Sequence, residues 1–233
     1  MKVIAFCVLA ALLAAFPAAA ADPVSEEEKT LYAIGLAVSQ NLSGFGLSEK
    51  ELSMVQQGLA DGVLGKTRKV DLQTYGPRIQ DLQKTRMTAQ AGNEKKAGAA
   101  FAAKAAGESG AKKLPSGLVI TQIKAGTGAS PAATDRVKVH YHGMLTDGTV
   151  FDSSVQRGEP ATFPLNQVIP CWTEGVQQMK VGGKSKLVCP SEIAYGDAGR
   201  LPRIKPGATL VFEVELLEIV KDGAPGAPPA PRK

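Results

Sequence analysis

Residues 137–154 read VKVHYHGMLTDGTVFDSS, and the first six alternate between apolar and polar side chains. Val137, Val139 and Tyr141 share one face of an extended chain, whereas a lysine and two histidines share the other. A period of two predicts a half-buried β-strand, and the following Thr146-Asp147-Gly148 predicts a turn into a second strand. This segment therefore favours an antiparallel sheet with one buried face.

The same period recurs toward the C-terminus, in two further predicted strands. Leu187 and Cys189 share one face, and residues 210–217, LVFEVELL, repeat the alternation with an inner face of Leu210, Phe212, Val214 and Leu216. One short helix is expected at Thr173–Lys180, directly after Trp172. An antiparallel sheet with a single helix makes this part of the chain α+β.

The preceding part, from Ser25 to about Gly110, has a helical pattern instead. Ser25 with Glu28 and Ser48 with Glu51 form capping boxes, which predict two helix starts. Apolar residues then recur at spacings of three and four, at Leu31, Ile34, Val38 and Leu42 and again at Leu52, Val55, Leu59 and Val63. Two short amphipathic helices are therefore expected, each with one apolar face.

A third helix is expected from the Asp71–Pro77 region to about Ala106. Beyond Met87 it is nearly all Ala, Lys, Glu, Gln and Gly, without a wide apolar stripe, so the pattern favours a stalk rather than a core element. Such a stalk cannot cover the first two helices, so we expect two chains to close a shared core as a homodimer. A small monomeric three-helix bundle is the alternative.

Met1–Ala20 is predicted to be a signal peptide. Lys2 precedes the apolar run Val3–Phe16, and Ala18-Ala19-Ala20 provides small residues for cleavage. The run is shorter than the roughly 20 residues that span a membrane. The mature chain is therefore expected to cross the inner membrane, with the periplasm, the outer membrane and the cell exterior all open as destinations.

Two cysteines, Cys171 and Cys189, remain after cleavage. An even pair in an oxidising compartment predicts a disulfide, and two buried free thiols are the alternative. A thiol enzyme is disfavoured because Cys189 lies on the apolar face of its strand.

Common catalytic and binding patterns are missing from the sequence. His140 and His142 have no third metal ligand at a plausible spacing, so a solvated strand face is preferred to a metal site and no cofactor is expected. The sequence has no glycine-rich phosphate loop. Its basic residues are not interleaved with aromatics, and the formal net charge is only +5, so nucleic acid is not an expected partner.

Aromatic residues are sparse at 5% but unevenly placed. Six of the ten that remain after cleavage fall in the predicted sheet region, at Tyr141, Phe151, Phe163, Trp172, Tyr195 and Phe212. Taken alone, this clustering favours an ordinary hydrophobic core.

Several motifs in this region resemble the FKBP-type peptidyl-prolyl cis-trans isomerases. They are 139–143 (VHYHG), 147–154 (DGTVFDSS), 168–176 (VIPCWTEGV), 194–196 (AYG) and 210–216 (LVFEVEL). The helical region before them is similar to the N-terminal domain of the secreted, Mip-like subgroup. The resemblance implies a curved antiparallel sheet wrapped on one short helix, after an all-helical dimerisation domain with a long stalk helix.

The resemblance also implies which residues form the site. Trp172 would form the floor of an aromatic pocket, and its walls and side would comprise Tyr141, Phe151, Phe163, Phe212, Val168 and Ile169. Asp152 and Tyr195 would supply polar groups at the rim, with Tyr141, Asp152 and Tyr195 as catalytic residues. The backbone N–H of Ile169 would donate to a substrate carbonyl, and macrolide inhibitors of the family would bind the same pocket.

This sequence departs from the family pattern in three places. Cys171 replaces the usual glycine before Trp172, and Ala161 stands where many members carry an aromatic residue. The loop Gly199–Ile204 is unusually basic, with Arg200 and Arg203. The last two differences affect the expected substrate preference rather than the pocket.

The implied function is isomerisation of X-Pro bonds in secreted or periplasmic polypeptides, which assists their folding. The alternative is a dimeric periplasmic holdase chaperone or virulence-associated factor with secondary isomerase activity. The expected organisation is a signal peptide at 1–20, a helical dimerisation domain at 21–70, a connecting helix at 71–111, an isomerase domain at 112–221 and a disordered tail at 222–233.

Overall fold

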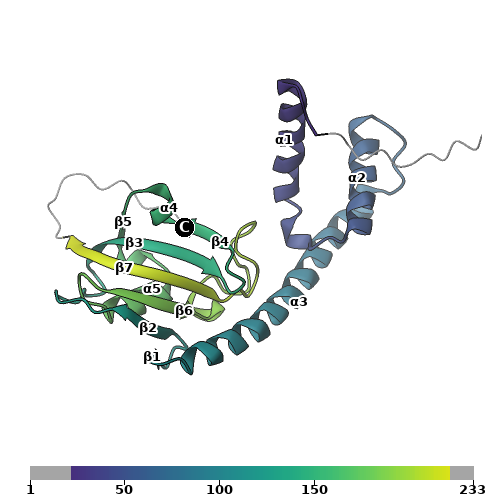
Figure 1. Cartoon of the computed structure of the whole chain (residues 1–233). Coiled ribbons are helices and arrows are strands. Elements are labelled where there is room, and N and C mark those ends of the chain that lie inside the picture. The colour runs from purple at the N-terminus through teal and green to yellow at the C-terminus, as the bar shows by residue number, and fades with distance from the viewer. Residues whose placement is uncertain (1–21, 221–233) are drawn as a thin grey trace, which may run out of the picture. The chain divides into compact units, whose positions relative to one another are not determined.

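The computed structural model describes residues 22–220, so the predicted signal peptide and the whole predicted C-terminal tail lie outside the described residues. Three helices come first, α1 (Glu26–Gln40), α2 (Glu49–Val63) and α3 (Leu72–Ala106), with a short 3-10 turn, η1 (Ser43–Phe45), after α1. Seven strands and two further helices follow (Figure 1). The predicted order of a helical part and then an α+β part is confirmed.

Both predicted capping boxes are present. The Ser25 hydroxyl accepts from the N–H of Glu28 at 3.1 Å, and the Glu28 carboxylate accepts from the N–H of Ser25 at 2.8 Å. Ser48 and Glu51 repeat this exchange at the start of α2. These bonds satisfy backbone donors that a helix start otherwise leaves without acceptors.

Helix α3 is 35 residues long and begins directly after Asp71, whose carboxylate accepts from the N–H groups of Gln73 and Thr74. Pro77 lies inside its second turn. A proline is tolerated close to a helix start because few intrahelical bonds are lost there. Arg86 ties the helix to the preceding segment, since it donates to the carbonyl of Phe45 at 3.0 Å and pairs with Glu51.

All strand pairs in the sheet are antiparallel, in the order β1-β2-β6-β7-β3-β4, and β5 pairs with the other part of β3. The strands are β1 (Ala111–Lys113), β2 (Val119–Lys124), β3 (Arg136–Leu145), β4 (Val150–Ser153), β5 (Ala161–Pro164), β6 (Lys184–Cys189) and β7 (Leu210–Val220). The predicted inner faces of β3 and β7 are all buried. The two-residue period therefore identified the core face of each strand correctly.

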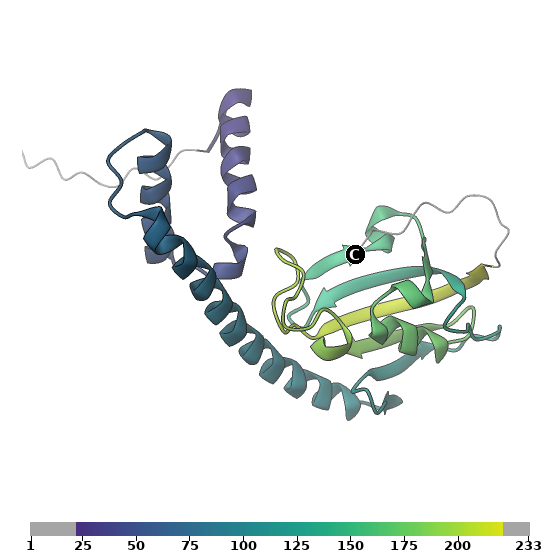
Figure 2. The same ribbon diagram turned by 180° about the vertical axis from the view of Figure 1, so that it is seen from behind.

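Helix α5 (Pro170–Gln177) lies over one face of the sheet, as Figure 2 shows from behind. It begins three residues before the predicted Thr173, because Pro170 occupies its first position, where no N–H is needed. The predicted disulfide joins Cys171 to Cys189 on β6, with 5.8 Å between the Cα atoms. A Cβ at Gly175 would lie 2.9 Å from the Leu187 side chain, so this glycine lets the helix approach the sheet closely.

The expected long helix is present as α3, but the expectation that its part beyond Met87 does not pack on a core is wrong. Its buried residues are Ala91, Gly98, Ala102 and Ala105, and the last two pack against Val119, Val188 and Val211 on the outer face of the sheet. Small side chains bury little area each, but they let the helix backbone lie close to the sheet. A search for large apolar residues overlooks such a contact.

Two glycines of α3 give a matched test of this packing. A methyl group at Gly98 would overlap the Thr209 side chain, whereas one at Gly92 would meet nothing within 4 Å. We predict that Gly92→Ala stabilises the protein by about 0.5–1 kcal/mol through helix propensity, and that Gly98→Ala destabilises it by about 1–3 kcal/mol through overpacking. Urea unfolding of both variants measures the difference, and equal stabilisation by both would contradict the contact.

Candidate functional site

The aromatic residues of the sheet region form one cluster around Trp172, which sits in the first turn of α5. The indole ring makes edge-to-face contacts with Tyr141, Phe163 and Phe212, at centroid distances of 5.3, 5.6 and 5.4 Å. Edge-to-face geometry places the positive edge of one ring on the negative face of another, which stabilises each pair beyond simple burial. Three of the predicted aromatic residues, from strands β3, β5 and β7, therefore lie around the Trp172 ring of α5.

The centre of this cluster is buried and its rim is partly exposed. Tyr141, Trp172 and Phe212 are each 4–5% exposed, whereas Phe151, Phe163, Val168 and Ile169 remain half-buried. The rim residues all pack against the same core. A ligand that reaches these four side chains therefore meets an apolar surface.

Gly143 explains the close approach of two of these rings. A Cβ at this position would lie 2.8 Å from Phe151 and 3.0 Å from Phe212. The two rings meet edge to face at a centroid distance of 5.6 Å. A glycine at this point of β3 thus leaves the space that both aromatic edges occupy.

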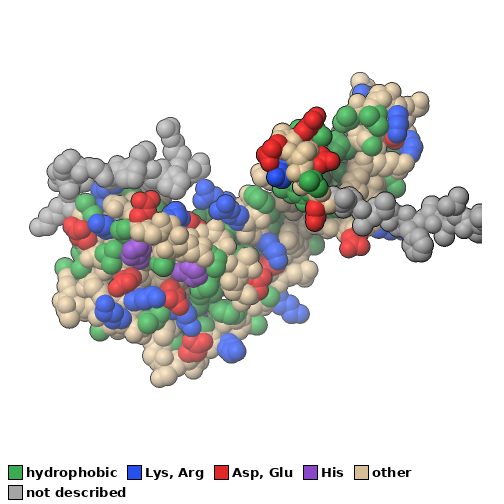
Figure 3. All heavy atoms as spheres, turned by 45° about the horizontal axis from the view of Figure 1, so that its top comes forward, with side chains coloured by type: hydrophobic (Ala, Val, Ile, Leu, Met, Phe, Trp, Pro, Cys, Tyr) green, Lys and Arg blue, Asp and Glu red, His purple; other side chains and the backbone are tan. Residues whose placement is uncertain are grey.

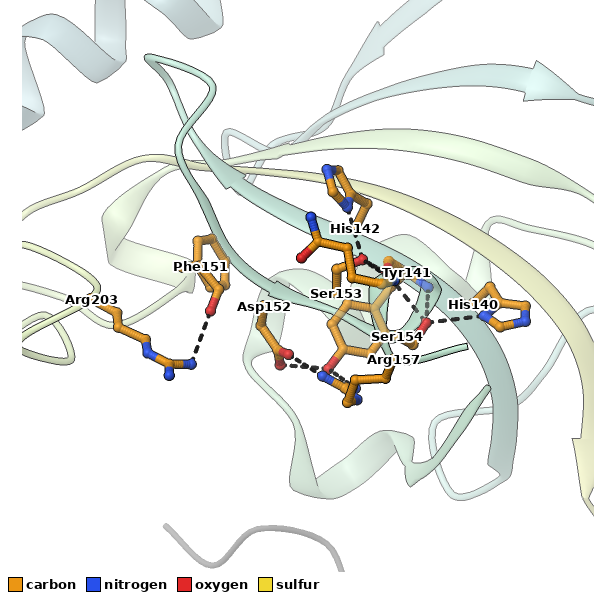
Figure 4. Close-up of polar contacts among 10 residues, drawn as sticks. His140, Tyr141, His142, Phe151, Asp152, Ser153, Ser154, Arg157 and Arg203 are labelled. Carbon is orange, nitrogen blue, oxygen red and sulfur yellow. Dashed lines mark hydrogen bonds and ion pairs between the residues drawn. The ribbon is translucent and has the colours of Figure 1, made fainter. Parts of the chain in front are cut away.

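Three polar side chains at the edge of the cluster, those of Tyr141, Asp152 and Arg157, are joined by hydrogen bonds. The Tyr141 hydroxyl donates to Asp152 at 2.5 Å, and Arg157 donates to the Tyr141 oxygen at 3.0 Å while pairing with Asp152 (Figure 4). Sequence reasoning missed Arg157. It is placed by the short helix α4 (Ser154–Arg157), which Ser153 caps at one end and Gly158 ends with a left-handed conformation, φ 79°.

These contacts determine the protonation states of Tyr141 and Asp152. Burial raises the pKa of Tyr141 to about 12, and the hydrogen bond to Asp152 adds to the rise. Burial alone would also raise the pKa of Asp152, but hydrogen bonds from Tyr141 and Arg157 outweigh it, and the net pKa is lowered. At neutral pH the group therefore comprises a neutral phenol, a carboxylate and a guanidinium.

Ile169, whose N–H is the expected donor to a client carbonyl, directly precedes α5. The carbonyl of Ile169 accepts from Trp172 and Thr173 at the start of α5, at 2.9 and 3.2 Å. Its N–H donates to no backbone acceptor within residues 22–220. The first turn of α5 therefore holds the carbonyl of Ile169 in place, whereas the N–H of the same residue has no backbone partner among the described residues.

Tyr195 lies apart from the edge-to-face contacts, although its side chain packs against the same core. The Arg200 guanidinium lies 5.9 Å from its ring centroid. No hydrogen bond of its hydroxyl involves any residue that the structure describes. The backbone carbonyl of Tyr195 accepts from the N–H of Gly199 at 3.1 Å, so its main chain is held while its hydroxyl is left without a described partner.

The two histidines of β3 lie on its outer face, as expected, and both form hydrogen bonds there. Both are half-buried, and their Nδ1 atoms form hydrogen bonds with the hydroxyls of Ser154 and Ser153, at 3.2 Å for His140 and 2.9 Å for His142. Ser154 also accepts from the N–H of Tyr141 at 2.8 Å. The histidines thus belong to the support of the β3–α4 segment.

Arg157→Gln tests the electrostatics of this group. The variant loses the guanidinium that lowers the pKa of Asp152, so this pKa should rise toward or above its ordinary value of 3.8. A carboxyl whose pKa is lowered by folding stabilises the protein above its unfolded pKa, and this contribution is lost as the pH falls through the folded pKa. We therefore predict that the variant is less stable than the wild type at pH 7, and that this difference shrinks as the pH falls below the unfolded pKa, because only the wild type has the Asp152 contribution to lose.

Urea unfolding between pH 3 and 7, combined with NMR titration of the Asp152 carboxyl carbon, provides the measurement. Lys138→Gln, which removes one positive charge elsewhere on β3, is the control. An Asp152 titration that is the same in the wild type and in Arg157→Gln would contradict the assigned contacts.

Comparison with protein-family models gives two matches. Residues 128–217 match the FKBP-type peptidyl-prolyl cis-trans isomerase family, and residues 27–120 match the domain amino-terminal to FKBP-type isomerases. The first match contains every residue of the cluster described above. The second covers α1 from its second residue onward, and all of α2 and α3.

Individual proteins are similar over most of their length. The FKBP-type peptidyl-prolyl cis-trans isomerase FkpA of Aeromonas hydrophila is 48% identical over 221 residues, which cover 88% of this chain and 81% of that protein. The outer membrane protein MIP of Legionella longbeachae is 34% identical over 213 residues, covering 87% and 91%. The crystal structure of FkpA from Escherichia coli superposes with a TM-score of 0.64 at 37% identity, covering 84% and 97%.

Proposed function

The chain belongs to the FKBP-type peptidyl-prolyl cis-trans isomerases, and from this premise we propose that it acts on proline-containing client polypeptides in the cell envelope and assists their folding. An envelope location fits the predicted signal peptide and the similarity to a protein named as an outer membrane protein. The observation that carries the site assignment is the bonded group of Tyr141, Asp152 and Arg157 beside the buried ring of Trp172.

The reaction needs rotation about one amide bond and no bond to the protein. Resonance gives the C–N bond partial double-bond character and a barrier of about 18–20 kcal/mol. The twisted amide loses this resonance and is less dipolar than the planar one. An apolar surface that replaces water therefore disfavours the planar form more than the twisted form, and each tenfold gain in rate needs only about 1.4 kcal/mol.

Each residue has a distinct role in this proposal. The proline ring lies against Trp172 within the aromatic walls, and the N–H of Ile169 donates to a client carbonyl. Asp152 holds Tyr141 in place and stabilises carbonyl charge as the amide twists, while Tyr195 offers a further hydroxyl at the rim. Since Asp152 is ionised and Tyr141 neutral at pH 7, these groups act by position and charge rather than by proton transfer. Macrolide inhibitors would occupy the same aromatic surface.

Asp152→Ala tests the site. We expect kcat/KM for an Ala-Leu-Pro-Phe peptide to fall about tenfold, equal to roughly 1.4 kcal/mol of transition-state stabilisation. Asp81→Ala, which changes an exposed aspartate on α3, is the matched control and should keep full activity. A folded Asp152→Ala variant with wild-type activity would remove Asp152 from the catalytic group.

The N-terminal helices carry the proposal of a homodimer. Neither α1 nor α2 contains a buried residue, and their apolar faces include Leu31 and Ile34 on α1 and Leu59 and Val63 on α2, each 51–75% exposed. Figure 3 shows hydrophobic side chains at the surface of this part of the chain. Exposed apolar faces of this extent favour burial against a second copy.

Leu59→Glu should shift the sedimentation of residues 22–233 from dimer to monomer, because it places a charge in an apolar contact. Gln57→Glu adds the same charge on a different side of α2 and should leave the dimer intact. Activity on short peptides should not change in either variant. A protein that sediments as a monomer before any substitution would contradict the homodimer.

The same exposed faces favour a second candidate function, a holdase chaperone that binds unfolded clients at the N-terminal helices. This activity would persist in Asp152→Ala and weaken in Leu59→Glu when aggregation of a denatured client is followed by light scattering. The opposite pattern would assign client binding to the aromatic site.

A further inference from the structure

The loop Gly199–Pro206 is held in a fixed conformation at the edge of the aromatic cluster. Arg200 and Ile204 exchange two backbone hydrogen bonds, at 2.8 and 3.0 Å, and close a tight ring. Ile204 is 3% exposed and belongs to the same core as Trp172. Gly199 has a φ of 64° and accommodates the close approach of the Ile204 carbonyl. The backbone that carries Arg200 and Arg203 is therefore anchored.

The two arginines of this loop reach two different parts of the site. Arg203 donates to the carbonyl of Phe151 at 3.3 Å, directly beside Asp152 (Figure 4). Arg200 lies over the ring of Tyr195. Both side chains are exposed to solvent. Two guanidinium groups therefore stand at the partly exposed rim of an otherwise apolar surface.

Neither arginine forms an ion pair within residues 22–220. The nearby carboxylates are paired elsewhere, since Asp152 pairs with Arg157, and both Glu192 and Asp197 pair with Lys95. The remaining cation of the loop, Lys205, pairs with Glu94 on α3 and also lies close enough to Asp147 to lower the pKa of that carboxyl. Among the loop's cations, Arg200 and Arg203 are thus the two whose charge is not offset by a neighbouring carboxylate.

We propose that Arg200 and Arg203 select clients that carry an acidic residue beside the isomerising proline. The inference rests on the proposed function of the aromatic site. A guanidinium presents a planar pair of N–H donors that matches a carboxylate, and its weak hydration favours such pairing. Asp152, the carboxylate next to Phe151 in the chain, is already bonded to Arg157 and Tyr141, so it opposes an acidic client less than a free carboxylate would.

The size of the effect follows from the exposure of both arginines. Ion pairs at exposed sites correspond to about 1.5- to 5-fold in binding for each pair, and salt screens them. Two arginines therefore predict a preference of about 2- to 20-fold for Glu over Gln at low ionic strength, falling toward 1 at high salt. Because Gln has nearly the shape of Glu, the ratio isolates the charge.

The experiment measures kcat/KM by NMR exchange for the full mature chain with short X-Pro peptides, at low salt and at 0.5 M salt. One series places Glu, Gln or Lys directly before the proline, and a second places them directly after it. We expect kcat/KM to decrease from the Glu peptide to the Gln peptide to the Lys peptide in at least one series. We also expect the double variant Arg200→Gln/Arg203→Gln to bring the ratio of kcat/KM for the Glu and Gln peptides to about 1. Each single variant should give a ratio between that of the double variant and that of the wild type. Lys205→Gln, which removes the same charge from the same loop, should retain the wild-type ratio.

The outcomes separate this inference from the proposed function. A protein that accelerates none of the peptides would overturn both. Equal rates for Glu and Gln peptides in both series, with clear isomerase activity, would overturn the selection of acidic clients and leave the isomerase assignment standing. A Glu preference that survives the double substitution, or that Lys205→Gln also abolishes, would overturn the assignment to these two arginines.

Discussion

The packing of Trp172 against the inner face of the sheet is the interaction on which the site depends. The ring touches residues from β3, β5 and β7, so its position fixes three strands relative to α5. Two features on α5 hold it there, namely the disulfide at the preceding residue, Cys171, and the close approach that Gly175 permits. The disulfide thus adds a covalent anchor directly beside Trp172.

The polar part of the site is arranged around this apolar base without competing with it. Asp152 and Arg157 reach Tyr141 at its hydroxyl, while the ring of the same residue packs on Trp172. Tyrosine can serve both purposes because one end of its side chain is apolar and the other is polar. Burying the phenol beside a carboxylate keeps it protonated to about pH 12. The site therefore presents a constant charge arrangement across the physiological pH range.

Much of this arrangement was predictable because it depends on local patterns. Alternation gave the inner faces of β3 and β7, the Ser-x-x-Glu spacing gave two helix starts, and the even cysteine pair gave the disulfide. Arg157 was not predicted, since its partner is chosen by the short helix α4, whose signals, Ser153 and Gly158, are individually common. The packing of α3 was missed because it depends on small residues, Ala and Gly, whose lack of a large side chain lets the helix approach the sheet. Gly98 matters only once Thr209 is known to lie opposite.

The contact between Gly98 and Thr209 connects α3 to the segment that carries Tyr195, Arg200 and Arg203. Thr209, which faces Gly98, is the last residue before β7, and Gly207 packs closely on the backbone of Ala91. Lys95 and Glu94 add ion pairs from the same helix to both ends of this loop, at Asp197 and Lys205. The loop is therefore supported on one side by the core, through Ile204, and on the other by α3. Since a charged rim discriminates between clients only if its charges are held in place, the packing of small residues along α3 contributes to specificity as well as to stability.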